Sequence, residues 1–449
     1  MLAFGAGEPP MNALGTAMAI SVQPYFAKDL GVDLLTIAAA FGLVRLIDMP
    51  VDPILAIFMD RTKTRLGRYR AWMLAGTPIL LASVWMLFMA QKGIGLGYLI
   101  VWLLVYALGT SIVGLARSAW SANLVTRYDQ RSQFYGYLGF IGVAGALIVL
   151  ETPTIAGWIP HRIHLPNNVQ LMGWVVLLMT PLGLGLNALL VPERINPDAA
   201  TNRYALRDYW DICKKPDVLR LFVSNFALAL GPGWMGNLYV FFFTAARGFT
   251  EKDANTLLSV YILAGVIAAP VIGWIGGRFG KHTTMIASTI FYSVGLCVVP
   301  FLPQGNFLLA IPVMVWTGFM ANGFGLMNQA MMADVGDEVR LEQGKERMGL
   351  LFAFTSLSSK LASAGAVMIS YPLLKVVGYV PTLAEHNTPA ALTGLTAIFI
   401  IGPIFWVILG GVCFIGWRLD AVRHAEIRLE LEARDAAMLA QSASGGGVA

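Results

Sequence analysis

Long apolar stretches recur along the whole 449-residue chain. A helix of about 20 apolar residues spans the hydrocarbon core of a bilayer, so each stretch predicts a transmembrane helix. Twelve such stretches lie at 8–27, 34–59, 71–91, 96–126, 133–158, 169–191, 218–245, 254–276, 284–302, 307–333, 348–378 and 391–417. The sequence therefore predicts an all-α membrane protein with twelve transmembrane helices.

The composition agrees with a polytopic membrane protein. Apolar residues make up 57% of the chain and charged residues 13%, and the mean hydropathy is +0.67. These values lie well outside the range of soluble globular proteins. The three cysteines lie far apart and predict no disulfide.

Most of the 31 Lys and Arg residues gather in alternate connections. These connections are 60–70, 127–131, 192–217, 277–282, 336–347 and the segment from 418 onward. Cytoplasmic connections of membrane proteins carry such an excess, so both termini are predicted to be cytoplasmic. The formal charge of +5 follows from this bias and is no argument for nucleic-acid binding.

A polar connection divides the chain in two. Six predicted spans precede residues 192–217 and six follow, which gives a first half at 1–191, a second at 218–418 and a tail at 419–449. Gly67-Arg68-Tyr69-Arg70 and Gly277-Arg278-Phe279-Gly280-Lys281 form basic turns at corresponding places in the two halves. This weak symmetry indicates a duplicated six-helix unit. The charge pattern of the tail predicts a solvated helix.

Several charged residues lie inside predicted spans, and four of them form the clearest pattern. Arg45, Asp48 and Asp52 share one face of the second span, at i, i+3 and i+7, and Lys360 lies near the middle of the eleventh. A charge at the bilayer centre costs about 2.5–3.5 kcal/mol or more, so these side chains must face the protein interior or a water-filled path. Asp48 and Asp52 predict a cation site. The alternative is a closed pair of Arg45 with Asp48 that fixes helix packing.

Two features extend this prediction. Pro50 and Pro53 each remove a backbone donor from the second span and predict a bend there. Lys360 has no acid on its own span, so we expect it to pair with Asp48 and Asp52 and to link the halves across a central cavity. The alternative is that Lys360 reaches towards a membrane interface.

Arg117 and Trp120 lie three apart on the fourth span. A guanidinium fork and a flat ring at this spacing can hold one ligand. The alternatives are that Arg117 pairs with an acid of the second span and that Trp120 packs in the core. Glu151, late in the fifth span, is expected either at an outer gate or at the outer surface.

Signals of catalysis are missing from the sequence. It contains no HExxH, no GxSxG and no P-loop lysine, and its five histidines fall in loops or in the tail. We therefore expect no enzyme activity, no cofactor, and no metal other than Na+ as a coupling ion at Asp48 and Asp52.

Two distant motifs resemble one family. Asp52-Pro53, Asp60-Arg61-Thr62 and Arg65-Leu66-Gly67-Arg68-Tyr69-Arg70-Ala71-Trp72 are similar to the DP...DRT..R.GR.RPW stretch of the glycoside, pentoside and hexuronide cation symporters. Ala333-Asp334-Val335, Gly344-Lys345-Glu346-Arg347-Met348-Gly349 and then Lys360 resemble that family's region joining spans ten and eleven. The resemblance covers nearly the whole chain. It implies the major facilitator fold of the melibiose-permease branch, with two six-helix halves.

The resemblance also implies roles for individual residues. Asp48 and Asp52 match the cation-site acids, Arg45 and Lys360 match charged residues beside them, and Trp120 matches an aromatic residue that stacks on sugar. The matched positions of the cytoplasmic gating motif are Asp60, Arg61, Gly67, Arg68, Arg70, Arg278, Lys281 and Arg347.

Some positions depart from the family pattern. Asn12 stands where melibiose-type members have an acid, and the pair Ala116-Arg117 where they have an acid followed by an apolar residue. Val51 stands where sodium-coupled members often have an amide. The galactoside-binding carboxylate pair is therefore missing. The predicted substrate contacts are Asn12, Arg45, Arg117, Trp120 and Lys360. Their excess of cations over Asp48 and Asp52 favours an anionic solute.

The sequence therefore predicts a secondary active transporter that uses H+ or Na+ to drive symport of a small solute by alternating access. A glycoside or a hexuronide-like anionic sugar is the main prediction. An anionic amphiphile such as a lysophospholipid is the alternative, and a membrane enzyme or receptor is a remote one. We expect a monomer in a bacterial-type inner membrane, with the solute and the lipid bilayer as its partners.

Overall fold

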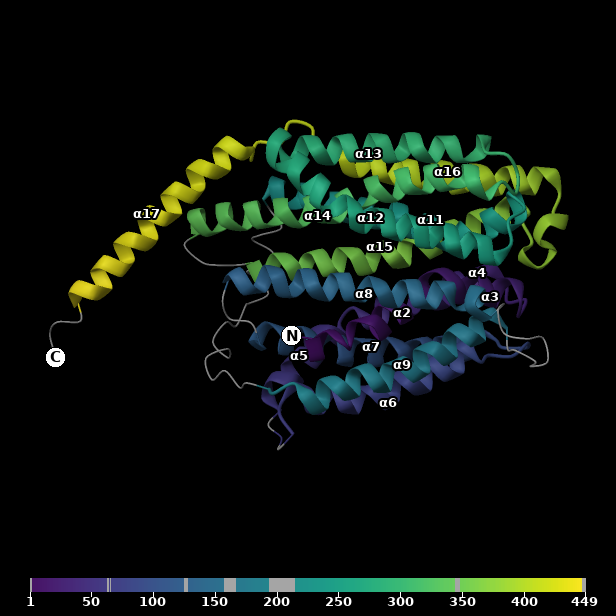
Figure 1. Cartoon of the computed structure of the whole chain (residues 1–449), viewed down its shortest axis with the longest axis horizontal. Coiled ribbons are helices and arrows are strands. Elements are labelled where there is room, and N and C mark those ends of the chain that lie inside the picture. Colours follow the sequence, from purple (N-terminus) through teal and green to yellow (C-terminus); the bar gives the residue numbers. More distant parts are fainter. Residues whose placement is uncertain are drawn as a thin grey trace.

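The computed structural model describes residues 2–62, 64, 66–124, 128–156, 167–193, 215–343 and 348–445. This part of the chain is helical and contains no strand. The long helices run side by side, with those from the first part of the chain next to those from the second (Figure 1). The predicted all-helical class is confirmed for these residues.

The elements before the central connection are α1 (Leu2–Gly5), α2 (Glu8–Ala17), the π-helical η1 (Met18–Val22), α3 (Gln23–Lys28), α4 (Leu34–Asp48), α5 (Val51–Arg61), α6 (Tyr69–Phe88), α7 (Leu96–Leu124), α8 (Tyr128–Ala156) and α9 (Asn168–Leu190). We call them the N-terminal helices.

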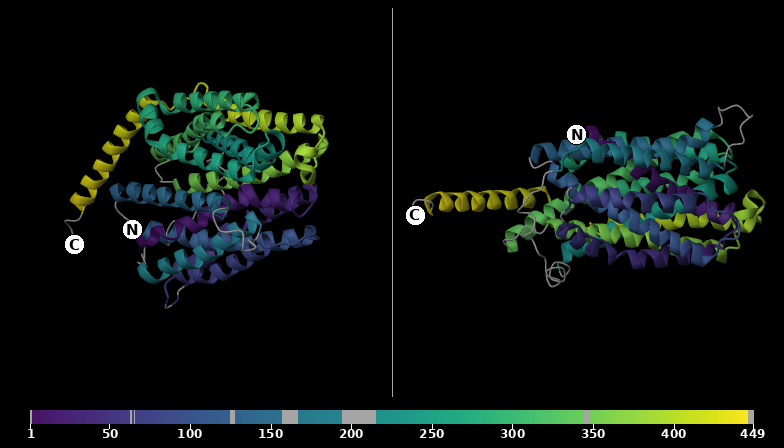
Figure 2. Two further views of the ribbon diagram at one scale, coloured as in Figure 1. Left: turned by 45° about the vertical axis from the view of Figure 1, so that its right-hand side comes forward. Right: turned by 90° about the horizontal axis from the view of Figure 1, so that it is seen from below.

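The elements after the connection are α11 (Pro216–Phe241), the π-helical η3 (Phe242–Ala246), α12 (Glu251–Phe279), α13 (Lys281–Val298), η4 (Val299–Phe301), α14 (Phe307–Gln343), α15 (Met348–Val376), η5 (Pro381–His386), α16 (Pro389–Val412) and α17 (Ala421–Gly445). Those up to α16 are called the C-terminal helices. The helix α17 is the predicted tail helix and projects away from the bundle (Figures 1 and 2).

Ten helices in the described part of the chain are long and apolar enough to cross a membrane. The first two predicted spans are not among them. The first is divided among α2, η1 and α3, and the second between α4 and α5. A multi-pass helical architecture is thus confirmed, and the count of twelve spans stays a prediction. The tenth predicted span ends later than expected, because α14 continues to Gln343.

The second predicted span is interrupted at Met49 and Pro50, which belong to no helix. Pro50 and Pro53 have no backbone N–H, so the carbonyl groups four residues earlier lose their helical donors. The predicted bend takes the form of this break. It places Asp48 at the end of α4 and Asp52 in the first turn of α5.

Side chains cap helix starts at one end of the bundle. The Asp33 carboxylate accepts a hydrogen bond from the Leu35 N–H at 3.0 Å, and the Thr250 hydroxyl accepts one from the Asp253 N–H at 3.1 Å. Such caps satisfy N–H groups that have no acceptor within the helix. They fix where α4 and α12 begin, beside the ion pairs described below.

The two largest contacts between the N-terminal and C-terminal helices are α4 on α15 and α8 on α12; η1 and α3 also pack on α11, and α3 on η5. Gly42 permits the first contact, because a Cβ atom there would overlap the side chain of Met368. Within the C-terminal helices, the rings of Phe242 and Phe399 stack with their centroids 4.0 Å apart. The close contact of α4 with α15 brings the charged residues of the two groups together.

Candidate functional site

A buried charge cluster lies where α4, α5, α7 and α15 meet. Asp48 is 2% exposed, and its Oδ2 accepts hydrogen bonds from Lys360 Nζ at 3.1 Å and from Arg45 Nη1 at 3.3 Å. Its Oδ1 accepts one from the Ser111 hydroxyl at 3.2 Å. Lys360 also forms an ion pair with Asp52. The structure thus makes the predicted contact of Lys360 with both acids, whereas Ser111 carried no signal in the sequence.

The cluster contains two cations and two carboxylates, so it is neutral when every group is charged. Asp52 Oδ1 is buried and has no hydrogen-bond partner in the described part of the chain. Carboxylate oxygen is a preferred ligand of hard cations and also accepts a proton. An incoming cation could take this oxygen and displace Lys360 from the acids. No group of three or more His, Cys, Asp or Glu side chains that could hold a metal ion occurs in the described residues.

A cavity of about 440 Å³ lies beside the cluster, between the N-terminal and C-terminal helices. Its volume falls within the range of about 300–1,000 Å³ that is usual for small-molecule sites. Most of the lining is apolar, and the polar side chains in it are Gln23, Arg45, Tyr106, Asn237 and Ser363. Arg45 lines this cavity and also donates to Asp48, so it links the cavity directly to the charge cluster.

Arg117 lies elsewhere. It is buried, and its Nη2 forms an ion pair with Glu8 Oε1 of α2 at 2.8 Å. Of the two interpretations of Arg117, the pairing with an acid of the second span is therefore wrong, because the partner is Glu8. Arg117 does not line the cavity, and Asn12, which donates to the Glu8 backbone carbonyl at 3.2 Å, does not line it either.

Sequence reasoning missed Glu8, whose signal was an acid at the start of an apolar stretch, four residues before Asn12. Because Glu8 neutralises Arg117, the charges that remain near the cavity balance. The charge count that favoured an anionic solute is thus wrong.

Trp120 is fully buried. Its ring meets the Phe4 ring edge to face at a centroid distance of 5.6 Å, and the Arg70 guanidinium lies 5.7 Å from the ring centre. These contacts leave no face for a sugar in this conformation. Of the two interpretations of Trp120, the structure shows the packing role.

The basic turn before α6 is held by one acid. Gly67 has a φ of +107°, which favours glycine, and a Cβ atom there would overlap the Glu193 side chain. The Glu193 carboxylate accepts hydrogen bonds from the backbone N–H groups of Arg68, Tyr69 and Arg70 at 2.9, 2.8 and 3.1 Å. A carboxylate at a helix N-terminus satisfies donors and complements the helix dipole. Gly67 is thus required by the turn itself.

The other predicted gating residues fall into two groups. Lys281 bonds both Asp334 oxygens at 2.7 Å, and the Arg278 guanidinium lies 5.6 Å from the centre of the Trp274 ring. Of Asp60 and Arg61 the structure describes only the helix backbone, and Arg347 lies outside the described residues.

The tail helix contacts the same acid, Asp334, and its neighbour Asp337. His424 Nε2 of α17 lies 3.1 Å from Asp337 Oδ2 and 3.3 Å from Asp334 Oδ1. All of these contacts stay within the C-terminal helices and the tail, just as the Glu193 contacts stay within the N-terminal helices.

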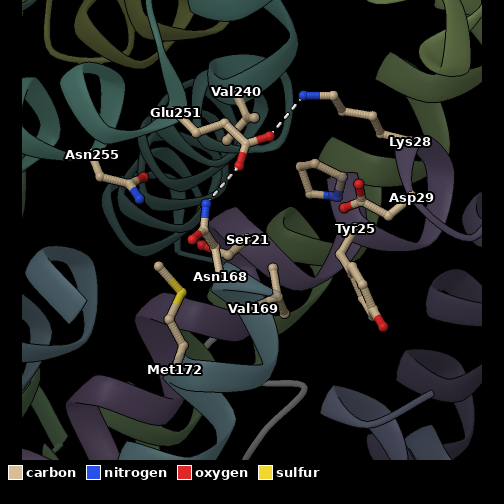
Figure 3. Close-up of a pocket in the computed structure, with 11 residues that line it drawn as sticks. Ser21, Tyr25, Lys28, Asp29, Asn168, Val169, Met172, Val240, Glu251 and Asn255 are labelled. Carbon is tan, nitrogen blue, oxygen red and sulfur yellow. Dashed lines mark hydrogen bonds and ion pairs between the residues drawn. The ribbon is translucent and has the colours of Figure 1, made fainter. Parts of the chain in front are cut away.

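Ion pairs at the opposite end join the two groups of helices. Glu251 of α12 accepts from Lys28 Nζ at 2.7 Å and from the Asn168 amide at 3.2 Å, beside a pocket of about 30 Å³ (Figure 3). Asp29 lines the same pocket, and burial together with the nearby Glu251 charge raises the pKa of its carboxyl, partly offset by Lys28.

Two more contacts cross the boundary at this end. Lys375 of α15 bonds Asp33 at 2.7 Å, and the Thr256 hydroxyl donates to Glu151 at 3.3 Å. Glu151 therefore faces the other group of helices rather than ending at a free surface. Among the described residues, the ion pairs between the two groups lie here and at the Lys360 cluster.

A family model described as MFS/sugar transport protein matches residues 3–421. The chain belongs to this family. It is therefore a multi-pass membrane transporter and not an enzyme.

Curated relatives are distant and cover most of the chain. An uncharacterized symporter, YnaJ of Bacillus subtilis, is 22% identical over 96% of this chain and 94% of its own length. The isoprimeverose transporter of Lactiplantibacillus pentosus is 24% identical over 89% of this chain and 84% of its own length. The sodium-dependent lysophosphatidylcholine symporter 1 of Xenopus tropicalis is 21% identical over 96% of this chain and 89% of its own length.

Solved structures agree on the fold. A mutant form of the nucleoside transporter NupG superposes with a TM-score of 0.70 over 92% of this chain and 98% of its own, at 12% sequence identity. At this identity the likeness concerns the fold alone.

Proposed function

We propose that this transporter couples the movement of a cation to the uptake of a glycoside or another small sugar. The position of Arg45 carries the proposal, because this side chain both lines the central cavity and donates to Asp48. A solute in the cavity and a cation at the acids would therefore act on the same guanidinium. The isoprimeverose transporter and the raffinose carrier protein of Pediococcus pentosaceus among the relatives support a sugar as the solute.

Asp48 and Asp52 are the proposed cation ligands, and Lys360 is their internal counterion. When the cation leaves, Lys360 neutralises the acids, so the empty site carries no net charge through the bilayer. When a cation binds, it replaces the ammonium at the acids and frees the contact between α5 and α15. Both H+ and Na+ fit two carboxylates, and the apolar Val51 beside Asp52 offers no additional oxygen ligand.

We further propose twelve spans in two six-helix halves, 1–191 and 218–418, joined by a cytoplasmic connection at 192–217 and followed by a cytoplasmic tail. The clustering of Lys and Arg supports this orientation. In this orientation, the Lys28–Glu251 and Lys375–Asp33 pairs close the outer end of the protein, so the structure corresponds to an inward-facing state. The proposed protein is a monomer in a bacterial inner membrane.

Uptake by proteoliposomes tests the proposal. Isoprimeverose, raffinose and methyl β-glucuronide are offered with an inward Na+ gradient, with an inward proton gradient and with neither. We expect accumulation of at least one sugar above equilibrium under one of the two gradients. Asp52→Asn should remove accumulation, and Glu426→Gln, which alters an exposed acid of the tail helix α17 outside the cluster, is the matched control. Equal uptake with and without gradients by the wild type would exclude coupling.

An amphiphile is the second candidate solute. The mainly apolar lining of the cavity and the lysophosphatidylcholine symporter among the relatives support it. Arg45 would then meet the phosphate of the head group. Offering lysophosphatidylcholine and the sugars to the same vesicles separates the two candidate solutes. If the solute is a lipid, lysophosphatidylcholine is taken up and none of the sugars is accumulated.

A further inference from the structure

Two residues with amide side chains line the central cavity, one from each of the two groups of helices. Gln23 is the first residue of α3, and Asn237 lies near the end of α11. Both side chains line the cavity, and each residue is 4% exposed. Each side of the boundary between the N-terminal and C-terminal helices therefore offers one amide to the same space.

Gln23 carries an unused hydrogen-bonding group. Its Oε1 is buried and has no hydrogen-bond partner in the described part of the protein. A buried polar atom without a partner costs free energy, and such atoms are rare enough to call for an explanation. Because Gln23 is among the residues that line the cavity, a solute or a water molecule there can supply the missing donor when the amide turns towards it.

The backbone before Gln23 is also unusual. The five residues Met18–Val22 form a π-helical turn, and Met18, Ala19 and Ile20 from it line the cavity. π-helical turns are rare and occur often at functional sites, because their wider i→i+5 bonding changes which side chains face a given direction. Here the turn lies between the face that carries Asn12 and the position of Gln23.

We propose that Gln23 and Asn237 form a subsite that binds hydroxyl groups of a neutral sugar, at a place different from the one that the family resemblance implies. An amide both donates and accepts, as a hydroxyl does, so an amide pair suits a polyol better than an ion. The apolar residues between them suit the C–H faces of a sugar ring. This inference rests on the proposed sugar transport and goes beyond it by naming the residues that select the solute.

The subsite lies far from the positions matched to sugar binding. Gln23 is eleven residues beyond Asn12 on the first predicted span, or roughly 16 Å along a helix. Arg117 and Trp120, the other matched positions, are engaged by Glu8, Phe4 and Arg70. The proposed solute site therefore lies nearer to the outer end of the molecule than the positions matched to sugar binding.

The test uses near-isosteric variants that remove the amides, Gln23→Met and Asn237→Leu. Ser370→Ala and Tyr371→Phe are matched controls, because both residues are fully buried, each has a hydroxyl without a partner in the described part of the chain, and neither lines the cavity. The probe is whichever of isoprimeverose, raffinose and methyl β-glucuronide the wild type accumulates. One neutral hydrogen bond corresponds to roughly a 2- to 13-fold change in affinity, so each amide variant should weaken binding by that factor, and the controls by less than about 2-fold.

Deoxy derivatives of the same sugar identify the contact. One derivative lacks the hydroxyl that Gln23 binds. The wild type should bind this derivative more weakly than the parent sugar, whereas Gln23→Met should bind the derivative and the parent sugar equally well. If every derivative loses the same factor in both proteins, or if both amide variants bind the parent sugar as the wild type does, Gln23 is satisfied by water alone and the subsite is wrong. Accumulation of no sugar by the wild type would instead refute the proposed function.

Cysteine labelling provides a second measurement if an amide variant folds poorly. In a protein whose three native cysteines are replaced by serine, Gln23→Cys should react with a small thiol reagent from the cavity, and the transported sugar should slow that reaction. Labelling that the sugar does not slow would overturn the proposal.

Discussion

Replacing Lys360 with methionine should make the charge cluster bind its cation more tightly while abolishing solute accumulation. The ammonium of Lys360 occupies the same two carboxylates that the cation needs, at 3.1 Å from Asp48 Oδ2 and in an ion pair with Asp52. Methionine keeps most of the volume and removes the charge. The cation then has no internal competitor, but the empty site is left with two acids and only Arg45 to balance them.

The expected gain follows from the contacts that are lost. A hydrogen bond to a charged group contributes about 1.5–3 kcal/mol. Lys360 makes two such contacts, but its side chain is 21% exposed and solvent screens it, so we take the value of one contact for the pair. At about 1.4 kcal/mol for each tenfold change, the dissociation constant of the cation should fall by roughly 10- to 150-fold.

Binding is measured by calorimetric titration of Na+ into the purified protein at constant pH and ionic strength. A pH titration replaces it if the wild type shows no Na+ response. Accumulation is measured in proteoliposomes with the same preparation. Lys92→Met is the control, because Lys92 is an exposed lysine in the connection between α6 and α7, outside the cluster and outside the ion pairs that join the two groups of helices. It should leave the affinity for the cation unchanged.

A weaker or unchanged affinity for both ions in folded Lys360→Met would refute the reasoning, because it would show that the ammonium and the cation do not compete for the acids. Wild-type accumulation by the same variant would show that the empty site needs no internal counterion.

Three further outcomes are expected. Glu8→Gln leaves Arg117 buried without its charged partner and should lower the free energy of unfolding by roughly 3 kcal/mol, measured by chemical denaturation; this is the lower end for a broken buried pair, because the Glu8 side chain is 22% exposed. A smaller loss in the double variant Glu8→Gln with Arg117→Met would confirm the pairing. Gly67→Ala should cost about 1–3 kcal/mol from its positive φ and should displace Glu193 from the α6 N-terminus; a loss in thermal denaturation that simply adds to that of Glu193→Ala would contradict this link. Asp29→Asn should raise the midpoint of thermal unfolding at neutral pH, because a carboxyl whose pKa is raised in the folded state destabilises the fold when it is ionised. The gain in the midpoint should shrink as the pH falls through that pKa, and a gain that is constant with pH would exclude ionisation of Asp29 as its cause.

Some parts of the site were within reach of the sequence. Lys360 had no acid on its own span and an intramembrane charge needs a partner, so its contact with Asp48 and Asp52 could be predicted across more than 300 residues of chain. Pro50 and Pro53 likewise predicted a bend in the second span, which the structure shows as the break between α4 and α5. In both cases the cost of an unpaired charge or a missing backbone donor left few alternatives.

Arg117 shows where that reasoning fails. A buried arginine needs an acid, but the sequence does not say which acid. Asp48 and Glu8 both satisfied the requirement, and the packing of α2 on α8 and α9 brought Glu8 to Arg117. For Trp120 the sequence left two interpretations open, and the short N-terminal helix α1, which brings Phe4 to its ring, decides for packing. Neither contact has a signature in residue spacing.

The sequence by itself determined that the chain is a bundle of membrane helices with charges that must meet inside it, because burying an unpaired charge or an unbonded backbone group in lipid costs too much to permit other arrangements. Only the tertiary structure decided which side chains surround the cavity. That depends on how each helix is rotated about its axis, which the π-helical turn before Gln23, the close approach at Gly42 and the pairing of Arg117 with Glu8 set together. Many rotations satisfy the hydrophobic pattern of a helix surrounded by lipid and other helices, so contacts between distant residues must choose among them.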